Sequence, residues 1–549
     1  GPAAAASTEG LATVDLAAVQ AYDVRDPAQA LLAYGWLHAA ATLQGIVNRD
    51  APRLFYDFLR GDERGQLRID QYWLALATAA GWPSAQPTRA LADVAAAVTE
   101  FRAHLAGAVV WDPTVAATSN VASTVAGADD VIAVPYDPSP QSAYSMLVDP
   151  TGTDRTRLTV RTWLVRRDGS PLFTGWGTVP GTGRKSTGSA KADAYWWAHD
   201  RYLATGRSNP TELAYFLDSY WLRQVAKSTW PHPIQNTLLS NHDFLVARRG
   251  FVFDLSPWPD EAPEDDLTQV PGTDLAVLEA ILGTAARRAG DSLRAIRGFV
   301  PWAIKYTSAA SDTSRQLAGH AEWKFVEIAS SYGCYLDADA EGLDPMSNAS
   351  LFSQFRTPQR YNAEPVPTVA QLRARGYLDA DGGVVPKRYV MIYTGDFDSA
   401  AWLYHMMPRL WEDAGRGSVP LNWAFDPHLD ERLPLGLVHA HESATVNDHF
   451  ISGDSGSGYV SPGALVDPTS QVGDSLRRWT ARNMSAFRKW GITVTGFVID
   501  GTSLPLTARQ YDASYGAFSP AGVITSTSHP YGVFGSTPFI RMGADLRGR

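Results

Sequence analysis

The stretch Ile451-Ser452-Gly453-Asp454-Ser455-Gly456-Ser457-Gly458-Tyr459-Val460-Ser461-Pro462-Gly463 decides how the C-terminal half of this chain is interpreted. The segment His449–Ser452 predicts a strand that ends next to Asp454. Glycines then follow the acid, and they allow the backbone to turn sharply and to approach a ligand closely. A carboxylate at the end of a strand, before such a loop, is how barrel enzymes present charge to a substrate.

Similar strand-like segments recur through the second half of the chain and alternate with helical patterns. This alternation predicts a parallel sheet, and eight repeats in about 300 residues predict a (β/α)8-like barrel. The expected strands are Gly250–Leu255, Gly298–Trp302, Gly333–Leu336, Tyr389–Thr394, Leu421–Phe425, His449–Ser452, Thr493–Ile499 and Gly522–Thr525.

The first half of the chain predicts a separate α/β region. Helical spacing covers Ala28–Val47, and the apolar segments Gly107–Trp111 and Asp130–Val134 flank a helical one to form a small βαβ unit. Asn209–Ala226 opens with Asn-Pro and is interpreted as a helix with a cap and a first-turn proline. We therefore expect an N-terminal α/β accessory domain over residues 1–240 and a catalytic barrel over 241–549, with an insertion near 357–387.

Acidic residues lie at the ends of six of the eight expected strands, although Asp and Glu account for only 57 of 549 residues. Glycosidic bond cleavage needs one protonated carboxyl group and one carboxylate, and clustered acids raise one another's pKa. Any single aspartate at such a position is better explained as a helix N-cap, so only the whole set of acids indicates catalysis. The expected catalytic residues are Asp398, Asp454, Asp396 and Asp500.

A second acidic segment, around Asp254-Leu255-Ser256-Pro257-Trp258-Pro259-Asp260-Glu261, predicts a platform for sugar stacking beside hydrogen-bonding acids. Its alternative interpretation is a solvated proline-rich turn. The expected substrate-binding residues are Asp254, Trp258, Asp260, Glu261, Trp302, Lys305, Asp337, Asp339, Asp426 and Tyr459.

Two patterns resemble metal sites. His439-Ala440-His441 has the spacing of a chelating pair only on a strand, and we interpret the segment as a helix, where the two side chains diverge. Asp337-Ala338-Asp339-Ala340-Glu341-Gly342 opens like a calcium loop, but Asn348 stands where the twelfth-position acid belongs. The sequence therefore predicts no metal or other cofactor, with calcium as the open alternative.

Composition limits the partners. The net charge is −10 and no long basic run occurs, which argues against nucleic acid as the main partner. The chain has no long uncharged apolar run of the kind that indicates a membrane span.

The single cysteine, Cys334, excludes an intramolecular disulfide. The small-residue start predicts a secreted or cell-envelope bacterial protein whose signal peptide has been removed. The oligomeric state is left open.

The quoted stretch resembles the signature of the GxGYxYP family of putative glycoside hydrolases. It reads Gly456-x-Gly458-Tyr459-x-Ser461-Pro462, so a serine occupies the position of the family's second tyrosine. The resemblance implies an N-terminal α/β domain, a barrel-like C-terminal domain and activity on carbohydrate.

These observations predict a glycoside hydrolase that cleaves a bacterial or plant polysaccharide or its oligosaccharides with two carboxylates. The Ala- and Arg-rich composition is typical of actinobacteria and points to arabinose-containing glycans. Two alternatives remain open, namely a metal-dependent deacetylase or amidohydrolase and a carbohydrate-binding protein without catalysis.

Overall fold

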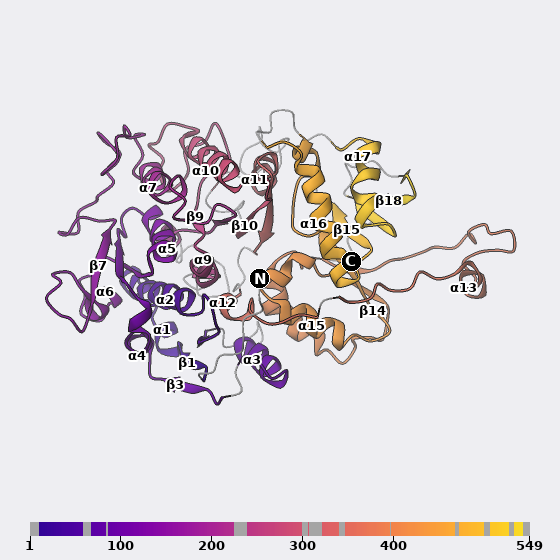
Figure 1. Ribbon diagram of the computed structural model, residues 1–549, viewed down its shortest axis with the longest axis horizontal. Coiled ribbons are helices and arrows are strands. Elements are labelled where there is room, and N and C mark those ends of the chain that lie inside the picture. Colours follow the sequence, from indigo (N-terminus) through magenta and orange to yellow (C-terminus); the bar gives the residue numbers. More distant parts are fainter. Residues whose placement is uncertain are drawn as a thin grey trace.

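The structure of the chain is a computed structural model. It describes residues 10–58, 67–83, 86–223, 239–298, 306, 321–339, 346–358, 360–395, 397–466, 472–498, 505–525 and 532–541. Figure 1 shows the N-terminal part of the chain at one end of the molecule and the C-terminal part at the other.

The N-terminal part contains two parallel sheets. One has the order β5-β4-β7-β6 and the other the order β2-β1-β3. Their strands are β1 (Ala12–Asp15), β2 (Leu54–Asp57), β3 (Arg89–Leu91), β4 (Gly107–Trp111), β5 (Val131–Pro135), β6 (Val148–Asp149) and β7 (Leu158–Trp163). The helices are α1 (Ala17–Gln20), α2 (Pro27–Val47), α3 (Ile69–Ala79), α4 (Val94–Glu100), η1 (Arg102–His104), α5 (Ala117–Asp129), α6 (Ala143–Leu147), α7 (Ala190–Ala198) and η2 (His199–Leu203).

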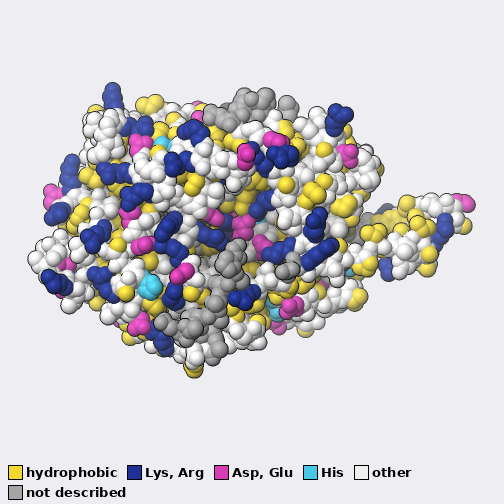
Figure 2. Space-filling view, viewed as in Figure 1, with side chains coloured by type: hydrophobic (Ala, Val, Ile, Leu, Met, Phe, Trp, Pro, Cys, Tyr) yellow, Lys and Arg dark blue, Asp and Glu magenta, His cyan; other side chains and the backbone are white. Residues whose placement is uncertain are grey.

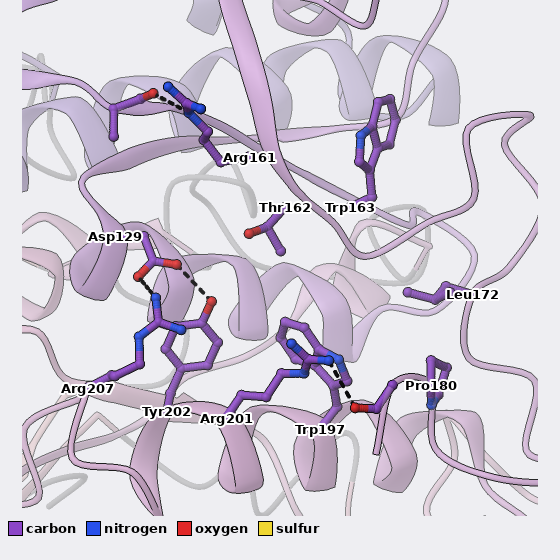
Figure 3. A pocket seen from close by; sticks show the side chains of 12 residues that line it. Asp129, Arg161, Thr162, Trp163, Leu172, Pro180, Trp197, Arg201, Tyr202 and Arg207 are labelled. Carbon is purple, nitrogen blue, oxygen red and sulfur yellow. Dashed lines mark hydrogen bonds and ion pairs between the residues drawn. The ribbon is translucent and has the colours of Figure 1, made fainter. Parts of the chain in front are cut away.

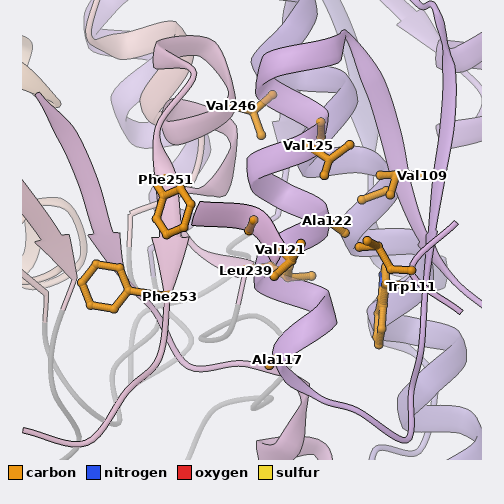
Figure 4. Packing of buried hydrophobic residues seen from close by; sticks show 14 of the residues in the cluster. Val109, Trp111, Ala117, Val121, Ala122, Val125, Leu239, Val246, Phe251 and Phe253 are labelled. Carbon is orange, nitrogen blue, oxygen red and sulfur yellow. The ribbon is translucent and has the colours of Figure 1, made fainter. Parts of the chain in front are cut away.

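Helix α5 lies at the centre of the largest hydrophobic core. Its Val121, Ala122 and Val125 are fully buried and face Val109 and Trp111 on one side and Phe251 on the other (Figure 4). The expected βαβ unit is therefore confirmed, and its helix also packs against strand β9 of the next sheet. The core thus connects residues that are more than 100 positions apart in the sequence.

The next sheet is parallel and has the order β11-β10-β8-β9. Its strands are β8 (Glu212–Tyr215), β9 (Phe251–Phe253), β10 (Arg294–Gly298) and β11 (Cys334–Ala338). Its helices are η3 (Ser219–Arg223), α9 (His242–Arg248), α10 (Thr273–Ala289), α11 (Ala321–Ser331) and α12 (Ala349–Phe352). Because β8 pairs with both β9 and β10, this sheet includes residues from either side of position 240.

The helix expected over Asn209–Ala226 is wrong, because residues 212–215 form strand β8. The Asn209 carboxamide oxygen accepts hydrogen bonds from the Thr211 backbone nitrogen (3.0 Å) and hydroxyl (2.8 Å). This is a local turn that leads into a strand, and asparagine favours it as readily as a helix cap. Pairing with β9 and β10 then outweighs the local signal.

The C-terminal part holds a seven-stranded sheet of order β12-β13-β14-β15-β16-β18-β17, parallel except for the last pair. Its strands are β12 (Tyr393–Thr394), β13 (Leu421–Ala424), β14 (Asp448–Asp454), β15 (Val494–Val498), β16 (Gly522–Thr525), β17 (Gly532–Phe534) and β18 (Thr537–Arg541). Its helices are α13 (Val369–Ala374), η5 (Trp402–Met406), α14 (Met407–Trp411), η6 (Pro427–Glu431), α15 (Pro434–Glu442), η7 (Pro462–Val466), α16 (Ser475–Trp490), α17 (Ala508–Ala513) and α18 (Tyr515–Phe518).

The α/β class and the parallel sheets are confirmed, but a full (β/α)8 barrel is not. Strand β8 inserts between β9 and β10, which breaks the sequential strand order that a barrel requires. Within the described residues, β11 joins the seven-stranded side only through an isolated bridge between Leu336 and Tyr459. The result is a curled, half-barrel arrangement. The division into domains at residue 240 remains a prediction.

The expected insertion forms an arm that projects from the molecule and carries α13 (Figure 1). Hydrophobic side chains are visible along it (Figure 2), and Val366, Val384 and Val390 are among the most exposed apolar residues.

Helix α2 is long and apolar enough to cross a membrane, with a mean hydropathy of 1.2. However, 89% of that window is buried inside the protein, where α2 packs against β5 and α9. A core helix and a signal sequence near the N-terminus both meet the same length and composition criteria.

Candidate active site

Two of the expected catalytic acids lie together at one edge of the seven-stranded sheet, after β12 and at the end of β14, the two strands that flank β13. Asp454 is the last residue of β14, and Asp398 follows β12 just before the helical segment that begins at Ala400. Their carboxyl groups form a hydrogen bond. Because the carboxyl ends of parallel strands share one edge, residues 56 positions apart in sequence can meet there.

The pKa of Asp454 is raised well above its usual value. Burial is the largest cause, followed by the charge of Asp398 and the hydrogen bond to it, with further contributions from Asp426 and Glu322. Two carboxyl groups in contact cannot both ionise easily, so this pair retains a proton at a pH where isolated aspartates are ionised. Both side chains are partly exposed, so the proton is accessible from solvent.

Asp426 lies behind this pair and is fully buried. Its Oδ1 accepts a hydrogen bond from the backbone nitrogen of Gly453, the residue before Asp454. Burial raises the pKa of Asp426 to about 7, while the neighbouring His428 opposes the rise and Asp398 adds to it. Asp426 therefore holds the end of β14 in place, and contact between Asp426 and substrate remains a prediction.

His428 connects Asp426 to a second group of charges. Its Nδ1 lies 3.4 Å from Asp426 Oδ2, and its Nε2 lies 3.1 Å from Asp337 Oδ1. Burial lowers the pKa of His428, but the charge of Asp337 and the contacts with Asp337 and Asp426 outweigh it and bring the pKa to about 9. The imidazole is consequently cationic at neutral pH.

Asp337 and Asp339, at the end of β11, are both held by Arg432. Arg432 Nη2 lies 2.6 Å from Asp337 Oδ1, and Nη1 lies 3.0 Å from Asp339 Oδ2. Burial raises the pKa of Asp337, but Arg432 and His428 lower it further, so its carboxylate stays charged. Burial raises the pKa of Asp339 to about 6, despite Arg432.

Arg297, on β10, extends this buried network. Its guanidinium contacts Asp337, and it lies 2.9 Å from Glu212 and 2.8 Å from Glu431. Arg482, on α16, binds the other oxygen of Glu431 at 2.9 Å. The network joins elements of both sheets, so it fixes the half-barrel beneath the acid pair.

Asp254, at the end of β9, belongs to a different polar cluster. Its carboxylate accepts hydrogen bonds from the hydroxyls of Tyr215 (2.9 Å) and Tyr306 (2.6 Å) and from the Asp218 nitrogen (3.1 Å). Tyr306 in turn contacts Lys191, which lies 2.7 Å from Asp274. Asp254 is fully buried, so this cluster stabilises the fold around β9.

The remaining expected contacts to sugar differ in exposure. Trp258 and Tyr459 are 4% and 1% exposed, and both rings lie in the largest core. Glu261 is buried and accepts a hydrogen bond from Ser256, whereas Asp260 is exposed. Sugar contact by these residues remains a prediction. Asp396, Asp500, Trp302 and Lys305 lie outside the described residues.

The glycines of the quoted loop serve close packing. Gly458 has φ +110°, and a Cβ there would lie 2.5 Å from Tyr335 Cδ2. Gly456 has φ +134°, and a Cβ there would lie 2.3 Å from Asn483 Oδ1. Ser461 is buried, and its backbone nitrogen donates to Ser330 Oγ at 3.0 Å. The loop is therefore a tightly packed support behind Asp454.

The two patterns that resembled metal sites take other roles. His439 and His441 lie on helix α15, as expected, and face different neighbours: His439 lies beside Tyr72, and His441 contacts the Trp490 carbonyl. The carboxylates of Asp337 and Asp339 point to Arg432. Within the part of the chain that the structure describes, no three His, Cys, Asp or Glu side chains are grouped to hold a metal ion.

Five residues of these polar clusters were not predicted from the sequence, namely His428, Arg432, Arg297, Lys191 and Glu322. A charged residue inside an apolar strand, as Arg297 is within β10, was the one available signal, because such a residue must find a buried partner. The others lie in helices or turns, where their sequence surroundings resemble those of surface residues.

Residues 386–535 match the family described as the GxGYxYP putative glycoside hydrolase C-terminal domain, which confirms the resemblance over that part of the chain. The fold is similar to the crystal structure of a putative hydrolase from Bacteroides thetaiotaomicron VPI-5482. That match has a TM-score of 0.59 and 15% sequence identity, and it covers 94% of this chain and 75% of the other. At this identity the likeness shows the fold alone. No curated protein matches the chain.

Proposed function

We propose that this protein is a glycoside hydrolase in which Asp454 donates a proton to the leaving oxygen of a glycosidic bond. The contact between Asp398 and Asp454 carries the proposal, because it keeps a proton on a partly exposed carboxyl group. A retained proton is what the general acid of a glycosidase requires. The match of residues 386–535 to a glycoside hydrolase family supports the same reaction class.

Asp398 is the proposed second carboxylate, acting on a water molecule or on the anomeric carbon. The hydrogen bond to Asp454 brings the two groups closer than the ~5–5.5 Å separation of retaining enzymes. The distance between catalytic groups in a site without ligand changes when substrate binds. We therefore propose that the leaving oxygen replaces Asp398 as the partner of the Asp454 proton, which frees Asp398 as a carboxylate.

Glu322, in the first turn of α11, is the alternative second carboxylate. It is partly exposed, and its charge contributes to the raised pKa of Asp454. Asp426 is a weaker alternative because it is fully buried. We propose that Asp426 positions Gly453 and Asp454. Asp396 and Asp500 are proposed supporting acids.

The substrate is proposed to be a bacterial or plant polysaccharide or its oligosaccharides, including arabinose-containing glycans. Export from a bacterial cell is proposed with it, since polymeric glycans of that kind lie outside the cytoplasm. Fractionation of cells that express the natural gene, followed by detection of the protein in the medium or envelope, tests the location.

A product screen tests the function. The parent protein, Asp454→Asn, Asp398→Asn and the control Asp381→Asn, whose carboxylate is exposed on the projecting arm, are incubated with neutral, acidic and arabinose-containing glycans. We expect sugar release by the parent and the control and loss in both site variants. Equal release by Asp454→Asn would remove Asp454 from the mechanism. Chelator-sensitive release of acetate or amine, without sugar release, would favour the metal-dependent alternative.

A further inference from the structure

A pocket of about 680 Å³ lies in the N-terminal part of the chain, among elements that contribute nothing to the Asp398–Asp454 pair. Its walls come from β7, from the end of α5 and from the segment α7–η2 (Figure 3). The volume falls within the range of about 300–1,000 Å³ that is usual for small-molecule sites.

Three arginines line this pocket, against one carboxylate. Asp129 is already paired, since it contacts Arg207 and accepts a hydrogen bond from the Tyr202 hydroxyl at 2.9 Å. Arg161 and Arg201 have no acidic partner among the described residues. The pocket is therefore locally positive in a chain whose net charge is −10.

Backbone contacts hold the two unpaired arginines in place. Arg161 Nε donates to the Ala106 carbonyl at 2.8 Å, and Arg201 Nη2 donates to the Gly181 carbonyl at 3.0 Å. A Cβ at position 181 would lie 2.5 Å from Arg201 Nη2, so glycine permits this approach. Within the described part of the chain, both terminal nitrogens of Arg161 and the Nε and Nη1 of Arg201 have no hydrogen-bond partner. These donors are available to a ligand.

Aromatic and apolar side chains complete the walls. The Arg201 guanidinium lies 5.0 Å from the Trp197 ring centroid, which holds the side chain at the pocket rim. Trp163 is partly exposed and lines the pocket together with Leu172 and Pro180. Figure 3 shows these side chains around one space, with Thr162 between Arg161 and Trp197. Planar guanidinium groups bind oxyanions through paired hydrogen bonds, and an aromatic face packs against the C–H face of a ring.

We propose that this pocket binds an anionic saccharide, with carboxylate or phosphate groups on Arg161 or Arg201, which lie on opposite sides of the pocket (Figure 3), and a sugar ring against Trp163. The preference for an anion rests on the arginines alone. The choice of a saccharide as the carrier of that anion rests on the proposed function. Such a site, distant from the acid pair, would hold a glycan chain while another part of it is cleaved.

Calorimetric titration tests this proposal with the full chain carrying Asp454→Asn, so that bound glycan is not consumed. The ligands are a galacturonic acid trisaccharide, the neutral galactose trisaccharide, a sugar phosphate and inorganic phosphate. We expect binding of the acidic trisaccharide or of the sugar phosphate, whichever carries the preferred anion, and at least tenfold weaker binding of the neutral trisaccharide. Arg161→Ala and Arg201→Ala should each weaken binding about tenfold or more, because each removes charge-assisted hydrogen bonds.

Arg155→Ala, at an exposed arginine outside the pocket, is the matched control and should leave the affinity unchanged. Thermal melting of each variant checks that it is folded. Binding of inorganic phosphate alone would reduce the site to an anion site and overturn the saccharide proposal. Equal binding of acidic and neutral trisaccharides, or no binding, would overturn it entirely. Because the readout is binding, failure of the hydrolase assay would leave this result interpretable.

Discussion

The aspartates at 337 and 339 and those at 398 and 454 all follow parallel strands, yet they have opposite electrostatic surroundings. Arg432, Arg297 and His428 surround the first pair, so Asp337 stays charged. Among the described residues, other acids raise the pKa of Asp454 in the second pair, so Asp454 retains a proton. Position at a strand end therefore brings carboxylates together, whereas the nearest cations decide whether they stabilise the fold or are available for proton transfer.

The largest expected effect comes from Asp454→Asn. Asparagine has the size of the protonated acid but cannot donate its proton, so we expect hydrolysis to fall by about 10²–10⁴-fold. The melting temperature should stay within a few degrees of the parent value, because the residue is already neutral in the folded state. An assay of released sugar measures the rate of hydrolysis, and a thermal melt measures the melting temperature. A loss of activity that follows a loss of folding would contradict the assignment.

Asp337→Asn should instead act on stability. It leaves Arg432, Arg297 and His428 around a neutral group, and removal of one partner from a buried ion network costs about 3–5 kcal/mol. Urea unfolding followed by tryptophan fluorescence measures the free energy of unfolding. The exposed Asp381→Asn is the control and should change it by less than about 0.5 kcal/mol. If Asp337→Asn also changed the free energy of unfolding by less than about 0.5 kcal/mol, the network would not hold the half-barrel.

The pH dependence of stability tests His428. Its folded-state pKa of about 9 exceeds the unfolded value of about 6.5, so its contribution is complete below about pH 6.5 and is lost as pH rises to 9. The expected loss is about 3 kcal/mol over that window. Asp426, whose pKa is raised to about 7, adds a loss between about pH 4 and 7. His428→Gln should flatten the curve between pH 6.5 and 9, as measured by urea unfolding at a series of pH values. An unchanged slope would contradict a cationic His428.

The smallest expected effect is that of Glu322→Gln. Its charge is a minor cause of the raised Asp454 pKa, so its removal should move the alkaline limb of the activity profile slightly to lower pH. Asp398→Asn, if enough activity remains to measure, should move that limb further, since Asp398 contributes more. Profiles of kcat/KM against pH make the comparison. A loss of 10²-fold or more in Glu322→Gln would transfer the role of second carboxylate from Asp398 to Glu322.

Much of the architecture could be predicted because it depends on local patterns. Strands β4, β5, β13 and β16 lie where apolar runs between turn residues place them. The approach of Asp398 to Asp454 could also be predicted, since both follow strands of one parallel sheet. The error at 209–215 arose where a local turn has the same sequence signal as a helix cap.

The cations could not be predicted, because each finds its partner through a contact distant in sequence. Arg432 and His428 lie more than 90 positions from Asp337, and Lys191 lies 83 from Asp274. Apolar periodicity is a local property of a chain, whereas the energy of a buried charge depends on which charges the fold brings beside it. The sequence by itself therefore determined most of the strands, the parallel sheets and the acids at the strand ends. Only the tertiary structure decided which of those acids are neutralised by cations and which pair retains a proton.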